Sequence, residues 1–142
     1  MYANMNSANR CECQIMAELI YPELSYKIIG LLFEVHNRLG GNFEEKYYQR
    51  AVEKLLKTYP IEFERELKAD ISYEGDKIGK YFLDFLIEHK IVLELKAVPV
   101  LQPIHFRQVR SYLKVKNLRL GILANFRGKK LLYRRILNPV KD

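Results

Sequence analysis

The sequence predicts an α/β (α+β) fold in which helices flank one mixed β-sheet. Stretches with helical and strand-like apolar spacing follow in the order helix, helix, three strands, helix, strand, strand. A lone helix joins two strongly apolar strands, which predicts a right-handed parallel crossover between them. Short polar turns join the three earlier strands, as expected for antiparallel hairpins. A mixed sheet satisfies both kinds of connection.

Two amphipathic helices are expected first. Leu24–Leu39 carries apolar side chains at spacings of three, four and seven, and Gly40–Asn42 ends this helix because these residue types tolerate left-handed backbone angles. The second helix spans about Phe43–Thr58. Its first turn contains Glu44 and Glu45, where the helix dipole favours anions. Both glutamates lie near the edges of the apolar stripe, so spacing does not select either as a functional carboxylate.

Five strands and a third helix make up the rest of the domain. The first strand alternates, with Phe63 and Leu67 expected on one side and the glutamates between them on the other. The third and fourth strands are more continuously apolar, which is typical of central strands covered on both faces. Lysine and arginine residues lie in and next to the last strand, as is typical of an edge strand, where charge opposes pairing with another chain. The expected strands are Ile61–Tyr73, Lys77–Ile87, Ile91–Val98, Leu118–Ala124 and Lys130–Leu137, with a helix at Ile104–Val115.

Length and composition indicate one globular domain. The chain has 142 residues, of which 49% are hydrophobic and 29% charged. Residues 1–22 read as a weakly structured lead-in that Pro22 closes, and residues 23–142 as a single domain. No run approaches the roughly 20 apolar residues of a membrane span, and the N-terminus lacks the apolar segment of a signal peptide. Cys11 and Cys13 cannot build a disulfide framework and receive no role, so we expect a reducing, cytoplasmic setting.

Positive charge is concentrated in the last third of the chain. Residues 95–142 hold 12 of the 24 Lys/Arg residues and a single acidic residue, Asp142. Such asymmetry points to an anionic partner, most often nucleic acid. A solvated basic surface is the other interpretation, and charge alone does not decide between them.

Three charged side chains stand out in the segment YFLDFLIEHKIVLELKAV. Glu94 and Lys96 share one face of their strand, and a hairpin would bring Asp84 close to Glu94. Two carboxylates that converge on an apolar sheet suit Mg²⁺, which takes hard oxygen ligands and keeps several waters. A neighbouring lysine can orient a water molecule or stabilise developing negative charge. The alternative is a structural Glu94–Lys96 ion pair.

The helix at residues 104–115 adds a second signal. His105, Gln108 and Tyr112 share one face at spacings of three and four. Taken alone, Tyr112 is expected to be core and His105 a surface or capping residue. A parallel basic row, which suits phosphate contacts but is equally compatible with a solvated helix face, comprises Arg107, Arg110 and Lys114.

The sequence resembles a known family at these positions. Asp84 followed by Glu94-Leu95-Lys96 is similar to the D…(D/E)-x-K signature of the PD-(D/E)XK nuclease superfamily. The segments YKIIGLLFEVHNRLG, EEKYY, FLDF, LELKAV, QVRSYL and GILANF resemble the small bacterial and archaeal family of GxxExxY proteins. The resemblance covers roughly Leu24 to Ile136 and implies a restriction-endonuclease-like core.

The resemblance also implies roles for individual residues. It places the family's glutamate on Glu45, as an additional metal or water contact, and its tyrosine on Tyr48. The Leu95 carbonyl would supply a further oxygen to the metal. Gln108 and Tyr112 match a Q-x-x-x-Y motif that lies beside the catalytic centre in related nucleases.

The chain departs from the family pattern at two positions. Asn42 stands where the family has glycine, and asparagine is the next most tolerant residue for positive φ, so the turn is expected to survive this replacement. Leu83 replaces the proline that names the superfamily, and this proline is not a ligand. His36, at the end of the first helix, is expected to be structural.

The expected function is therefore metal-dependent phosphodiester hydrolysis of DNA, in preference to RNA. Mg²⁺ or Mn²⁺ would be bound by Asp84, Glu94, Glu45 and the Leu95 carbonyl, and Lys96 would position the attacking water. The alternative is a non-catalytic nucleic-acid- or protein-binding module that retains the nuclease fold. A small-molecule enzyme is disfavoured, because the chain has no Gly-rich phosphate loop and no clear nucleophile–base pair. Dimerisation is left open, although so small a domain needs a second copy to cut both strands in one encounter.

Overall fold

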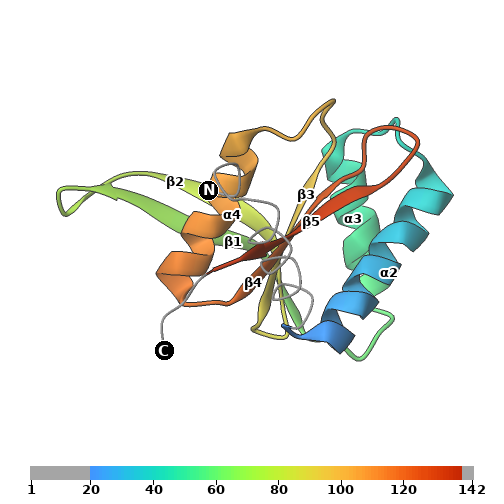
Figure 1. The fold of residues 1–142 in the computed structure, drawn as a ribbon, viewed down its shortest axis with the longest axis horizontal. Helices are drawn as coiled ribbons and strands as arrows, with labels where there is room; N and C mark the ends of the chain where they lie inside the picture. Colours follow the sequence, from blue (N-terminus) through green and yellow to red (C-terminus); the bar gives the residue numbers. More distant parts are fainter. Residues whose placement is uncertain (1–19, 139–142) are drawn as a thin grey trace, which may run out of the picture.

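Five strands form one mixed sheet in the order β1-β2-β3-β4-β5, with helices on both of its faces (Figure 1). The computed structural model describes residues 20–138, so most of the lead-in predicted at residues 1–22 lies outside the described residues. The elements are α2 (Pro22–Leu39), α3 (Glu45–Leu56), β1 (Phe63–Tyr73), β2 (Asp76–Ile87), β3 (Ile91–Lys96), α4 (Pro103–Lys116), β4 (Leu120–Asn125) and β5 (Leu132–Leu137).

The predicted directions of strand pairing are confirmed. β1, β2 and β3 pair antiparallel through short turns, β3 and β4 pair parallel across α4, and β5 returns antiparallel to β4. The turn before β2 contains Glu74 (φ 49°) and Gly75 (φ 85°), and the turn before β3 contains Glu88 and His89, also with positive φ. Two consecutive residues of positive φ match the twist of the flanking strands in a tight hairpin.

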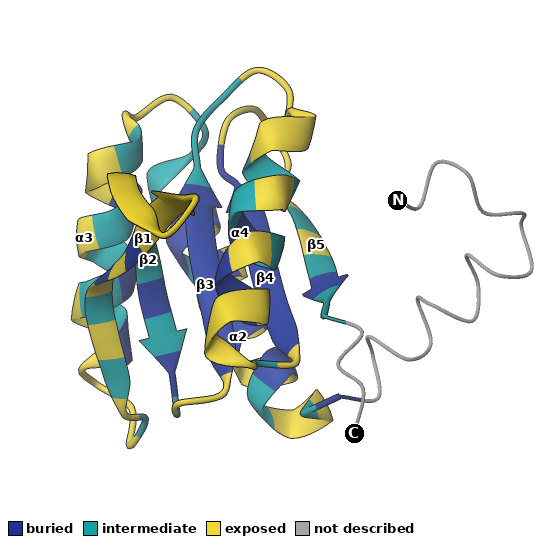
Figure 2. Ribbon diagram, turned by 90° about the vertical axis from the view of Figure 1, so that its left-hand side faces the viewer, coloured by how far each residue is buried: buried dark blue, intermediate teal, exposed yellow. Residues whose placement is uncertain are grey.

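The core has two layers that meet at the sheet. Apolar side chains of α2 and α3 pack against one face of β2, β3 and β4, and those of α4 pack against the other. Figure 2 shows β3 and β4 buried along their length between these layers, as their continuous apolar sequences predict. None of the helices within residues 20–138 is long and apolar enough to cross a membrane.

The boundaries of two helices differ from the prediction. Pro22 does not close a lead-in but lies in the first turn of α2, where its missing N–H is not needed. α3 begins at Glu45 rather than Phe43, because the Phe43 N–H is bound by the Tyr48 hydroxyl at 3.2 Å. The left-handed residue of the preceding turn is Gly40 (φ 76°), whereas Asn42 does not have positive φ. The turn thus forms with asparagine at this position, and it does not draw on the tolerance of Asn42 for positive φ.

β3 ends two residues earlier than predicted because a side chain replaces its strand partner. The Asn125 amide, buried at the end of β4, donates to the Val98 carbonyl at 2.8 Å and accepts the Val98 N–H at 3.0 Å. The segment after Lys96 is held against β4 without continuing the sheet ladder.

The prediction that Phe63 and Leu67 share one face of β1 is wrong. Phe63 packs against the α2–α3 layer, whereas Leu67 belongs to the α4 layer. Between them Glu66 has φ 55°, a left-handed conformation that interrupts the pleat of the strand. The side chains of β2 switch from one face of the sheet to the other opposite Glu66. Phe85 lies in the α2–α3 layer, whereas Leu83, two residues away, lies in the α4 layer.

Beyond this level the β1–β2 hairpin leaves the sheet as an arm. β2 pairs with β3 only from Phe85 to Ile87, while its pairing with β1 continues to the turn at Tyr73–Asp76. In Figure 1 the arm projects away from the body of the protein. Asp84 lies at the point where β2 separates from β3.

Candidate active site

The separation of β2 from β3 is where the two predicted acidic residues meet. The Asp84 N–H donates to Glu94 Oε1 at 3.0 Å, and the Leu95 N–H donates to Asp84 Oδ2 at 2.7 Å. Each carboxylate thus takes the place of a ladder partner that the diverging strands no longer supply. Backbone hydrogen bonds of this kind fix both side chains at the strand ends.

Burial and charge repulsion dominate the electrostatics of this pair. Glu94 is 3% exposed. Burial first, and the negative charge of Asp84 second, raise the pKa of Glu94 to about 9, against the opposing effect of Lys96. Burial also raises the pKa of Asp84. Lys96 Nζ lies 3.4 Å from Glu94 Oε2, so one ammonium group lies beside two crowded carboxylates.

α3 adds a third carboxylate to the site. Glu45 is the first residue of α3 and is half-buried, and burial raises its pKa while the neighbouring Lys96 lowers it. Glu44 is exposed and forms only a loose ion pair with Lys46 at 3.8 Å. Of the two glutamates that spacing left equivalent, the structure brings only Glu45 to Asp84 and Lys96.

Gln49 connects α3 to the strands and was not predicted from the sequence. Its side-chain nitrogen donates to Glu45 Oε2 at 3.0 Å and to Asp84 Oδ1 at 2.8 Å. Gln49 lies one helical turn after Glu45, which is the only signal in the sequence that could have identified it. Arg65 is a second residue that was missed: its guanidinium group pairs with Glu53 at 3.0 Å and lowers the pKa of Asp84.

Tyr48 and His36 support the turn that leads into α3. Tyr48 is fully buried, stacks on Phe126 with ring centroids 4.5 Å apart, and donates to the Gly40 carbonyl. His36 Nε2 lies 3.0 Å from the Gly128 carbonyl oxygen, which confirms its structural role. These contacts hold the start of α3, and with it Glu45, over the end of β3.

The other candidates lie along α4. His105 caps this helix, since its Nδ1 accepts the Gln102 N–H at 2.9 Å, as one interpretation of the sequence expected. Tyr112 is buried in the α4 layer, and burial and the nearby Glu64 raise its pKa. Among the described residues, neither Gln108 nor Tyr112 forms a side-chain hydrogen bond with Glu45, Asp84, Glu94 or Lys96. The basic row follows the outer side of α4, with Arg107 and Lys114 exposed and Arg110 half-buried.

The donor set fits a hard divalent cation. Three carboxylates, those of Glu45, Asp84 and Glu94, face the single ammonium of Lys96, so the site has an excess of negative charge when ionised. Within residues 20–138 no three Asp, Glu, His or Cys side chains are close enough to hold an ion by themselves. Two carboxylates with a backbone carbonyl and retained waters match the preference of Mg²⁺.

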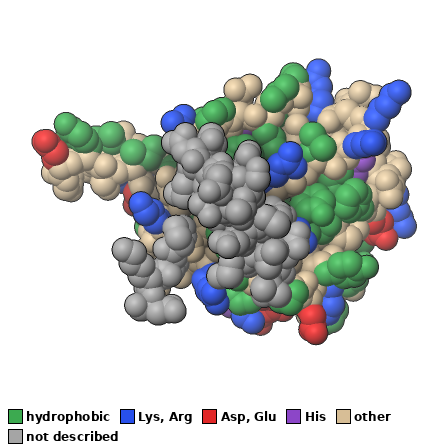
Figure 3. Space-filling model, viewed as in Figure 1, with side chains coloured by type: hydrophobic (Ala, Val, Ile, Leu, Met, Phe, Trp, Pro, Cys, Tyr) green, Lys and Arg blue, Asp and Glu red, His purple; other side chains and the backbone are tan. Residues whose placement is uncertain are grey.

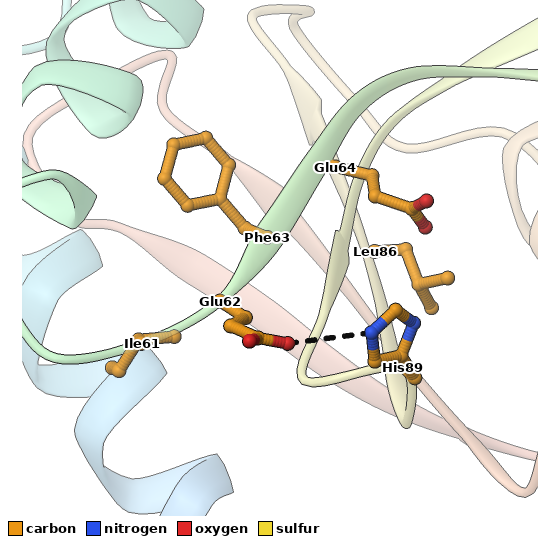
Figure 4. A pocket seen from close by; sticks show the side chains of 6 residues that line it. All are labelled: Ile61, Glu62, Phe63, Glu64, Leu86 and His89. Atoms are coloured by element: carbon orange, nitrogen blue, oxygen red, sulfur yellow. Dashed lines mark ion pairs between the residues drawn. The ribbon is translucent and has the colours of Figure 1, made fainter.

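Another hollow on the surface lies away from this chemistry. Figure 4 shows the residues that line this pocket, Ile61, Glu62, Phe63, Glu64, Leu86 and His89. Its volume is about 280 Å³. Its Glu62–His89 pair, at 3.4 Å, is between exposed side chains. The pocket adjoins the turn before β3, and Lys96 ends that strand. It therefore contributes nothing to the carboxylate site.

The fold and the candidate site together indicate the class of protein to which this chain belongs. A mixed sheet with helices on both faces and acidic residues at two diverging central strands is the architecture of the restriction-endonuclease-like proteins. The chain belongs to the PD-(D/E)XK nuclease superfamily, which it matches over residues 22–136. Membership of this superfamily suggests a nuclease.

A solved structure has the same fold. The crystal structure of SSO0001 aligns with a TM-score of 0.53 and 24% sequence identity, over 92% of this chain and 64% of that one. This chain therefore spans less than two thirds of SSO0001, and the likeness bears on the fold alone. A comparison with curated proteins gives no match.

Proposed function

We propose that this protein is a divalent-metal-dependent nuclease of the GxxExxY type that hydrolyses phosphodiester bonds of DNA in preference to RNA. The observation that carries the proposal is the convergence of Asp84, Glu94 and Lys96 where β2 separates from β3. A buried pair of carboxylates that repel each other costs folding free energy. Binding a divalent cation offsets that cost.

Asp84, Glu94 and the Leu95 carbonyl would hold Mg²⁺ or Mn²⁺, and Glu45 would hold a metal-bound water or a second ion. When bound, such an ion polarises a phosphoryl oxygen and lowers the pKa of a water molecule. Lys96 orients that water and stabilises negative charge that develops on the phosphate. Gln49 keeps Glu45 and Asp84 in one arrangement through its two hydrogen bonds.

α4 supplies the contacts to the nucleic acid backbone. Arg107, Arg110 and Lys114 offer charge-assisted hydrogen bonds to phosphates, which are largely independent of sequence and weaken with salt. Gln108 and Tyr112, on the same helix, would orient Lys96 or the scissile phosphate.

The test is a cleavage assay on labelled single-stranded DNA, duplex DNA and RNA, in Mg²⁺, Mn²⁺ or EDTA. We expect cleavage that requires the metal and falls at least about 100-fold in Lys96→Ala, since removal of one charge-stabilising group typically costs that much. Absence of wild-type cleavage on every substrate at low salt, with binding retained, would instead favour the non-catalytic binding module.

Gln49→Leu tests the bridge between the helix and the strands. Leucine has a similar size but cannot donate to Glu45 or Asp84, so we expect cleavage to fall about 10–100-fold. The Mn²⁺ concentration for half-maximal activity should rise, because the carboxylates lose their common orientation. Thermal unfolding checks that the fold is intact. Unchanged metal dependence would show that Gln49 does not position the site.

A further inference from the structure

The outer edge of the sheet presents an unusual strand. β1 is the edge strand, and among residues 20–138 no strand pairs with its outer side. The arm that it forms with β2 carries exposed apolar side chains, among them Tyr73, Ile78 and Phe82, which are 64%, 65% and 53% exposed. Figure 3 shows hydrophobic side chains along the projecting arm. An open strand edge next to apolar surface is a template for pairing with another chain.

The charge of the arm does not favour a polyanion as its partner. The whole chain has a formal net charge of +7, but residues 67–83 contain three lysines and three acidic residues. The acidic side chains are Asp70, Glu74 and Asp76, and the lysines are Lys68, Lys77 and Lys80. Two copies of a positively charged protein repel each other least where each is locally neutral. The arm is such a region, so a second copy fits it better than nucleic acid does.

The sequence of β1 is self-complementary about Ala69. If two copies of β1 pair antiparallel with a two-fold axis at Ala69, each Lys68 lies opposite Asp70 of the second copy, and each Leu67 lies opposite Ile71. Cross-strand pairs of opposite charge and of apolar side chains both stabilise a sheet. An axis at Lys68 would instead place Lys68 against its own copy, and an axis at Asp70 would oppose two carboxylates.

The longest regular stretch of the β1 backbone coincides with this segment. Glu66 has φ 55° on one side, and the register with β2 shifts between Ile71 and Ser72 on the other. The longest uninterrupted segment of β1 is thus Leu67–Ile71, with Ala69 at its centre. The five residues that the two-fold pairing requires are the five that form a regular edge.

We infer that β1 joins a second copy of this chain, antiparallel and centred on Ala69, so that one sheet runs through the dimer. The inference does not depend on the proposed nuclease activity, and neither of its tests uses that activity. The dimer is isologous, since each copy contributes the same segment.

Disulfide trapping tests the position of the axis. In a Cys11→Ser/Cys13→Ser background, Ala69→Cys should form a covalent dimer on mild oxidation, because directly opposed Cα atoms lie about 4.5–5.5 Å apart. Ile71→Cys is the matched control, since its two copies would be roughly 14 Å apart, beyond the reach of a disulfide. Trapping at position 71 in place of 69, or at neither, would overturn the inference.

Charge exchange tests the contacts in the same dimer. Sedimentation across a concentration series should show that Lys68→Asp raises the dimer dissociation constant at least about ten-fold, because two attractive pairs become repulsive. The double variant Lys68→Asp/Asp70→Lys should restore wild-type dimerisation. A wild type that stays monomeric, or a double variant that dimerises no better than the single one, would contradict the proposed pairing. Thermal unfolding of each variant confirms that the arm is folded.

Discussion

Glu94→Gln is expected to abolish metal-dependent cleavage and, in the absence of metal, to raise the melting temperature above neutral pH. Glutamine keeps an oxygen to accept the Asp84 N–H, which Glu94 Oε1 now accepts at 3.0 Å. Glutamine lacks the negative charge of the carboxylate, which is the ligand that a divalent ion prefers. We expect the rate of cleavage to fall at least about 1,000-fold, since without this ligand the site does not hold the ion that stabilises the charge developing on the phosphate.

The stability effect follows from the raised pKa of Glu94. Burial and the nearby Asp84 raise it to about 9, above the value of 4.5 that the unfolded chain retains. The native state therefore holds more protons than the unfolded state between these two values, and wild-type stability falls as the pH rises through that window. Glutamine does not titrate, so the variant should match the wild type near pH 5 and exceed it at pH 8. We expect at least about 1 kcal/mol there, or about 4 °C in melting temperature.

Thermal unfolding in EDTA at a series of pH values measures this difference. Adding Mg²⁺ should then stabilise the wild type and leave Glu94→Gln nearly unchanged, because only the native wild type binds the ion. Lys96 keeps Asp84 and Glu45 as neighbouring carboxylates in the variant. A variant that is less stable than the wild type at every pH would show that the Glu94–Lys96 pair is structural, as in the binding-module alternative.

The sequence predicted the elements of the fold well because each carries a local signal. The apolar alternation, the glycines after α2 and the turn residues around β2 all act within a few positions along the chain. The face change at Glu66 has no such signal, because glutamate rarely adopts positive φ and the pleat predicts strict alternation. This change separates the arm from the sheet, so the arm could not be predicted from the sequence.

The acidic part of the site was predictable, and its support was not. Asp84, Glu94 and Lys96 are charges inside apolar strands, which is unusual enough to be visible in a sequence. Gln49 is an ordinary residue of a surface helix, and its hydrogen bond to Asp84 spans 35 positions. The same holds for Asn125, whose side chain ends β3 only because the fold brings the Val98 backbone next to it. Contacts of this kind depend on the packing of α3 and β4 against β3.

Gly41→Ala is expected to destabilise the protein strongly, by about 2–4 kcal/mol. A Cβ added at Gly41 would lie 1.9 Å from the carbonyl oxygen of Gly128, which is backbone and cannot rotate away. The Gly128 N–H donates to the Gly41 carbonyl at 3.2 Å, and the Gly128 oxygen lies 3.0 Å from His36 Nε2. The added carbon must separate the loop before β5 from the turn after α2.

Gly30→Ala is the matched control, because an added Cβ there meets nothing within 4 Å and Gly30 lies inside α2. Alanine is the better helix former, so this variant should be more stable by about 0.5–1 kcal/mol. Chemical denaturation of both variants measures the two effects in opposite directions. If Gly41→Ala unfolds like the wild type, the close approach to Gly128 does not hold the turn, and the placement of Glu45 rests on Tyr48 and on the hydrogen bond from Gln49. If it is destabilised as expected, cleavage should fall further than the loss of folded protein explains, because that turn leads directly to Glu45.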